Sequence, residues 1–196
     1  ALPPAPSFPE AAEPAPQARP LTRRFATGRT IVALILREMS TSYGRSPGGY
    51  AWAILEPLGA ILLLSAGFSL VARHPSLGTN FLLFYATGYL PFSLFQSTSN
   101  PVARSIIYSR ALLMYPVVTW VDAVLARFLL NTLTALMVSY LLLTGILLIY
   151  DTGAVISVGP ILMAMLMAAL LGLGVGSTNC VLMGLFPTWS SVWSIF

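Results

Sequence analysis

The sequence has no lysine, a single cysteine, a single histidine and few charges of either sign. Only 8% of its 196 residues are charged, and all ten basic residues are arginines. Without lysine, the chain can form neither the Walker A phosphate loop of a nucleotide hydrolase nor a lysine Schiff base. Any ATP hydrolysis that serves this chain therefore has to come from a separate subunit.

The scarcity of cysteine and histidine excludes further kinds of site. Cys180 alone cannot form an intrachain disulfide or a cysteine metal cluster, and we expect it to be a small packing residue. With His74 alone, we expect neither a histidine-based metal site nor a Ser-His-Asp triad, and Ser177 has no histidine to activate it. We predict no catalytic residue, no metal and no cofactor, in a chain that is not an enzyme.

Apolar residues are abundant: they make up 57% of the chain, and the mean hydropathy is +0.82. A soluble domain has roughly 25% charged residues, so this composition predicts an all-α polytopic membrane protein. The predicted spans cover residues 52–71, 81–99, 122–149 and 156–185, with Asn100-Pro101 ending the second. A fifth span is predicted to begin within 189–196, and we therefore expect the sequence to be a fragment.

Two segments precede the first predicted span. Residues 1–26 are rich in proline and alanine and are predicted to be a disordered tail. Residues 29–45 are predicted to form an amphipathic helix, because at 100° per residue most of their apolar side chains share one arc. That arc contains Ile31, Val32, Ile35, Leu36, Met39 and Tyr43. Because an apolar span follows, we expect this helix to lie in the membrane interface; an ordinary soluble helix is the alternative. Gly48-Gly49 is the predicted flexible joint.

The arginines predict the orientation in the membrane, since positively charged residues favour the cytoplasmic side. The N-terminal region is arginine-rich, and the connection over 101–118 carries Arg104 and Arg110, while the opposite connections carry Arg73 and Asp151. We predict that the N-terminus and the 101–118 connection are cytoplasmic.

A stripe of aromatic and polar residues is predicted on one face of the second span. Tyr85, Tyr89, Phe92 and Gln96 are spaced by four, three and four residues. Aromatic rings and hydrogen-bonding groups together suit the binding of sugars, so this stripe is a candidate substrate path. Aromatic packing between helices is the alternative.

Small residues recur at every fourth position of the fourth span. They are Ala164, Ala168, Gly172, Gly176, Cys180 and Gly184. Such a ridge lets a neighbouring helix approach closely, and Gly172 with Gly176 forms one GxxxG motif. The helix could slide along its neighbour during a transport cycle or pack statically, and the sequence does not separate the two.

Two ionisable residues lie inside predicted spans. Charges at such a depth are costly unless they pair or reach the headgroups. Glu56 and Arg127 are therefore candidates for an ion pair, with separate extension toward the cytoplasmic headgroups as the alternative.

An ordered set of short motifs resembles the permease subunits of ABC-2 type transporters, in the group that exports capsular polysaccharide and O-antigen. The motifs are Arg37-Glu38, Tyr43-Gly44, Gly49-Tyr50-Ala51-Trp52, Glu56-Pro57, Leu112 to Pro116, Leu171 to Gly176, and Asn179 to Pro187 with Trp189. The resemblance covers about residues 27–196 and implies an ABC-2 transmembrane domain of a six-span permease in the bacterial inner membrane.

The resemblance also implies a set of partners. It implies a permease homodimer that docks ATPase subunits and moves a lipid-linked glycan outward, continued by a periplasmic adaptor and an outer-membrane exporter. Membrane lipids are expected partners, and nucleic acid is not. The candidate ATPase-coupling residues are Arg37, Glu38, Arg104 and Arg110. Alternative functions are export of a drug, teichoic acid or lipid, or a scaffold for envelope assembly that transports nothing.

Overall fold

The computed structural model describes residues 26–42, 48–71, 75, 80–114, 118–150, 157–186 and 188–195, and every regular element among them is a helix. The elements are α1 (Ala26–Ser42), α2 (Gly49–Val71), α3 (Phe81–Ala103), α4 (Ser105–Ser109), α5 (Trp120–Ile149), α6 (Val158–Leu185) and α7 (Trp189–Trp193). The predicted all-α class is confirmed. The predicted tail before residue 26 lies outside the described residues, as do Arg45, Arg73, His74 and Asp151.

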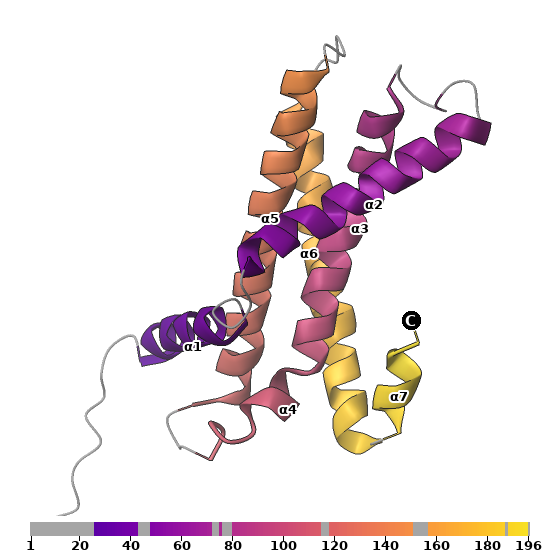
Figure 1. Ribbon diagram of the computed structural model, residues 1–196. Coiled ribbons are helices and arrows are strands. Elements are labelled where there is room, and N and C mark those ends of the chain that lie inside the picture. Colours follow the sequence, from indigo (N-terminus) through magenta and orange to yellow (C-terminus); the bar gives the residue numbers. More distant parts are fainter. Residues whose placement is uncertain are drawn as a thin grey trace, which may run out of the picture.

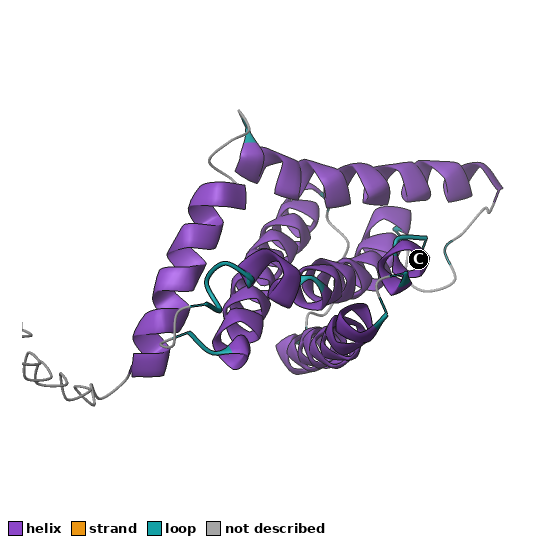
Figure 2. Ribbon diagram, turned by 90° about the horizontal axis from the view of Figure 1, so that it is seen from below, coloured by secondary structure: helices purple, strands orange, loops and turns teal. Residues whose placement is uncertain are grey.

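Three long helices, α3, α5 and α6, run side by side, and α2 crosses them obliquely (Figure 1). Seen from below, α1 and α2 lie lengthwise at the edge of the bundle (Figure 2). The helices α1, α4 and α7 all lie at one end of the bundle, which we call the base (Figure 1). This arrangement brings the N-terminal helix and the connection between α3 and α5 to the same end.

Three of the described helices are long and apolar enough to cross a membrane: Ala51–Val71, Trp120–Ile149 and Val158–Leu185. α3 has the same 23-residue length as α2, but its lower mean hydropathy keeps it outside this group. It lies at the centre instead, in contact with α2, α5 and α6. Neighbouring helices therefore cover much of the surface that a more apolar span would expose to lipid.

The central core forms where α3 meets α5 and α6. Its buried members are Ile61, Ala86, Leu90, Leu94, Val138, Leu142, Ile146, Met165, Ala168 and Ala169. α2 supplies only Ile61 to this cluster, and most of its other side chains stay partly or fully exposed. α2 is thus the least enclosed of the long helices.

The ends of three elements follow local chemistry. Gly48, just before α2, has a φ of +91°, a left-handed conformation that glycine adopts without strain. Thr119 and Asp122 form a capping box at the start of α5, with the Asp122 N–H donating to the Thr119 hydroxyl over 3.3 Å. Helix α3 continues past Asn100-Pro101, where the second span is predicted to end, as far as Ala103. Proline fixes φ near its helical value and removes only one N–H donor, so the last turn still forms.

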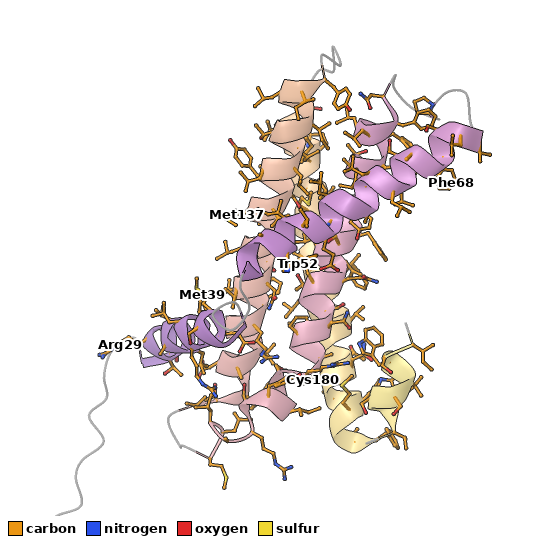
Figure 3. All side chains as sticks on the ribbon, in the orientation of Figure 1. Arg29, Met39, Trp52, Phe68, Met137 and Cys180 are labelled. Atoms are coloured by element: carbon orange, nitrogen blue, oxygen red, sulfur yellow. The ribbon has the colours of Figure 1, made fainter. Side chains whose placement is uncertain are left out.

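Helix α1 has two apolar sides rather than one. Its half-buried residues Ile31, Leu34, Ile35 and Glu38 share one face, and α1 packs against α5. The apolar residues Val32, Leu36 and Met39 are exposed on the adjoining face, and Figure 3 labels Met39 there. A helix that packs on a span and still exposes an apolar side suits the membrane interface.

Candidate functional site

Arg127 lies two turns into α5 and binds groups from two other helices. Its Nη2 lies 2.9 Å from Oε1 and 3.1 Å from Oε2 of Glu38 on α1. Its Nη1 donates to the main-chain carbonyl of Pro101 near the end of α3 over 3.3 Å. The Arg127 side chain is only 9% exposed and that of Glu38 is 26% exposed. The ion pair is therefore shielded from solvent mainly on the arginine side.

Arg127 makes two further contacts, one through its guanidinium and one through its main-chain carbonyl. The ring of Tyr108 on α4 lies under the guanidinium, with 4.7 Å between the guanidinium carbon and the ring centroid. That distance is within the range of a cation–π interaction. Asn131 follows one turn along α5 and donates from Nδ2 to the Arg127 carbonyl over 2.8 Å. We call Arg127, Glu38, Pro101 and Tyr108 the arginine junction.

The proposed pairing of Glu56 with Arg127 was wrong. Among the described residues Arg127 pairs with Glu38, and Glu56 is exposed on α2, within electrostatic reach of Tyr89. The packing of the helices explains the difference. α1 packs along the start of α5, whereas α2 crosses the bundle farther from the base (Figure 1).

The four candidate coupling residues divide into two groups. Arg37, Arg104 and Arg110 are exposed at the base, whereas Glu38 turns inward to the arginine junction. A pocket lies where α1 meets α4 and α5. It is lined by Leu34, Arg37, Glu38, Ser109, Ala123, Ala126 and Arg127.

The candidate substrate stripe on α3 is also divided. The ring of Tyr85 lies 5.2 Å from the ring of Phe68 on α2, centroid to centroid, and 5.2 Å from that of Phe84. Tyr89 is partly buried against the core, 6.4 Å from the ring of Phe92. Phe92 is 52% exposed, and Gln96 is also exposed. Tyr85 thus takes part in packing between α2 and α3, while Phe92 and Gln96 remain on an open face of α3.

The small-residue ridge of α6 faces α3. A Cβ atom placed on Gly172 would lie 3.0 Å from Thr98 Cβ, and one on Gly176 would lie 2.8 Å from the Ser99 carbonyl oxygen. Cys180 continues the contact to α4, with its Sγ 3.6 Å from the Ser105 hydroxyl. Ala164 and Gly184, at the two ends of the ridge, are exposed. The close approach permitted by the GxxxG motif is therefore made to α3.

Sequence reasoning missed two contacts that tie α7 to the bundle. Trp189 Nε1 donates to Asn179 Oδ1 on α6 over 2.8 Å, and Trp193 Nε1 donates to Asn100 Oδ1 on α3 over 2.9 Å. Both pairs join an indole N–H, which only donates, to an amide oxygen. Asparagines near the ends of two spans, followed by a Trp-x-x-x-Trp segment, were the available signal.

Comparison with known proteins gives a consistent group of relatives. Two Escherichia coli proteins named Polysialic acid transport protein KpsM are similar to this chain. One is 37% identical over 114 residues, which is 58% of this chain and 44% of that protein. The other is 32% identical over 166 residues, which is 83% of this chain and 63% of that protein.

A third relative has a related name. The Capsule polysaccharide export inner-membrane protein CtrC of Neisseria meningitidis serogroup A is 28% identical over 166 residues, covering 85% of this chain and 63% of that protein. No protein-family model matches the chain. In each of these three alignments the chain spans less than two thirds of the relative's length.

The relatives and the fold agree on what kind of protein this is. Homologues named for the inner membrane and helices able to cross a bilayer together identify a multi-pass inner-membrane protein. The chain is similar to proteins named for polysaccharide transport and for capsule polysaccharide export at the inner membrane, and the predicted resemblance to this group is confirmed.

Proposed function

We propose that the chain is part of the permease subunit of an ABC exporter that moves capsular or related surface polysaccharide, carried on a lipid, across the inner membrane. The observation that carries this proposal is the similarity over 166 residues to proteins named for polysaccharide transport and capsule export. The permease performs no covalent chemistry, and a separate ATPase subunit hydrolyses ATP. A second permease copy completes the path, which a periplasmic adaptor and an outer-membrane exporter continue.

The base of the bundle is the proposed cytoplasmic face and ATPase-binding end. Its exposed Arg37, Arg104 and Arg110 come from α1 and from the connection between α3 and α5. Positive charge on this side agrees with the cytoplasmic orientation. These arginines would meet acidic groups of the ATPase or lipid headgroups.

The open face of α3 is the proposed glycan path. Phe92 and Gln96 are exposed there, and a polar amide in a membrane is stable where it faces water, substrate or another protein surface. Gln96 can hydrogen-bond sugar hydroxyls, and the faces of Phe92 and Tyr89 can pack against the C–H faces of a sugar ring. Tyr85 supports this path from its position against Phe68.

Deletion of the full-length gene, followed by staining of surface glycan and chemical analysis of the trapped polymer, tests the function. We expect glycan to accumulate inside the cell and to reach the surface again when the gene is restored. Normal surface glycan in the deletion strain would contradict the proposal. A trapped lipid or teichoic acid in place of capsular glycan would assign another substrate.

The path is tested separately in the restored gene. A Phe92→Ala, Gln96→Ala double variant should reduce export while leaving the amount of permease in the membrane unchanged. Unaltered export would remove this face of α3 from the path. Leu133→Ala, which alters an exposed apolar residue of α5 outside the path, serves as the control.

A further inference from the structure

Four helices meet at one guanidinium group. α5 carries Arg127, and α1, α3 and α4 supply its partners through Glu38, the Pro101 carbonyl and Tyr108. Two of these partner helices, α1 and α4, lie at the base, and the other, α3, is the central helix of the bundle (Figure 1). Glu38 and Arg127 are 89 residues apart in sequence, so the pair exists only when α1 is seated on α5.

An ion pair is not the most stabilising contact that could hold these helices together. Apolar residues of similar volume stabilise buried contacts as well or better, because they need no desolvation of charge. A guanidinium adds direction instead. Its N–H groups lie in one plane at fixed angles, and an aromatic ring packs on its face. One rigid group therefore fixes the orientation of three neighbouring helices relative to α5.

We propose that Arg127 is a positioning residue that transmits movements of α1 and α4 to the long helices α3 and α5. The inference rests on the proposed function, in which an ATPase binds at the base. A displacement of α1 carries the Glu38 carboxylate with it, and the bound guanidinium draws α5 and the Pro101 end of α3 in the same direction. α2 packs on α3 and follows its movement.

The test compares ATP hydrolysis with glycan transport across the membrane in the full-length permease assembled with its ATPase in sealed proteoliposomes. Glu38→Gln keeps the side-chain volume but removes the charge, and Arg127→Lys keeps the charge but removes the planar fork. We expect both variants to assemble and to hydrolyse ATP near the wild-type rate. The glycan exported per ATP should fall at least about fivefold, the lower end of typical coupling between sites.

Arg29→Gln is the matched control, since it removes an exposed positive charge from the same helix α1 away from the junction (Figure 3). Its export per ATP should equal that of the wild type. Should Glu38→Gln fail to accumulate, Glu38→Asp keeps the charge but shortens the side chain by one methylene. The longer distance to Arg127 should also lower export per ATP.

Two results would overturn the inference. Export per ATP could stay at the wild-type value in both variants, or export and ATP hydrolysis could fall together in proportion to the folded complex recovered. The second result would assign Arg127 a purely structural role. Failure of the proposed function looks different, because the wild-type complex itself would then export no glycan.

Discussion

At Arg127 the cost of removing one charge should exceed the cost of removing both. Glu38→Ala leaves the buried guanidinium without its anion, and we expect a loss of about 1–3 kcal/mol, moderated by the partial exposure of Glu38. Replacing Glu38 and Arg127 together by leucine should cost less than the single change, because no unpaired charge remains. Thermal unfolding of the purified protein in detergent measures both. A double variant less stable than the single one would contradict this account.

The indole of Trp189 offers a second test at the scale of one residue. Trp189→Phe removes the donor to Asn179 Oδ1, with an expected cost of about 1 kcal/mol. α7 is short and has few other ties to the bundle, so amide hydrogen exchange over Trp189–Trp193 should become faster. Trp120→Phe, at an exposed position of α5, should leave that exchange unchanged. Equal exchange in both variants would show that the hydrogen bond does not hold α7.

At the scale of a helix pair, two glycines of α6 should respond to alanine with opposite signs. Alanine at Gly176 would bring its Cβ within 2.8 Å of Ser99 and Val102, so Gly176→Ala should destabilise the protein by about 1–3 kcal/mol. Gly174 is exposed with open space around it, and Gly174→Ala should stabilise by up to about 1 kcal/mol through helix propensity. Melting temperatures of the two variants, compared with wild type, decide the matter. A shift of the same sign in both would contradict the close α3–α6 contact.

The positions of the helices could be predicted from local sequence, but which helices pack against each other could not. Apolar runs and turn residues indicated where the helices lie, because helix formation in a membrane depends on nearby residues. The partner of Arg127 depends on which helix packs beside α5, and nothing within α5 specifies that. Glu56 was therefore the predicted candidate, and Glu38 was not considered as a partner. The small ridge of α6 indicated a close neighbour but did not identify α3.

The burial of the candidate path residues on α3 also could not be predicted from the sequence. The spacing of Tyr85, Tyr89, Phe92 and Gln96 correctly places them near one face of a helix. Their different exposures arise because α2 crosses α3 obliquely and meets Tyr85 through Phe68 (Figure 3). A crossing angle depends on the packing of both helices, so it cannot be read from the sequence of one.

At the scale of the whole molecule, the bundle predicts which residues a membrane-impermeant thiol reagent reaches. Met114 is exposed at the base, and Tyr150 is partly exposed beyond the opposite end of α5. In a full-length protein in which Cys180 and any further cysteine are replaced by alanine, Met114→Cys should react only in inverted vesicles and Tyr150→Cys only in cells with a permeable outer membrane. The reverse pattern would overturn the orientation inferred from the arginines.

The polar centre of the bundle also has a consequence for how the protein is made. Thr98 and Ser99 of α3 are buried, and Thr98 Oγ1 has no hydrogen-bond partner among the described residues. These two residues are buried against α6, which leaves the ribosome only after α5 has been synthesised. During that interval α3 must expose hydroxyl groups to lipid or remain with the insertion machinery. We therefore expect α3 to be released into the bilayer late, together with α6, rather than in the order of translation.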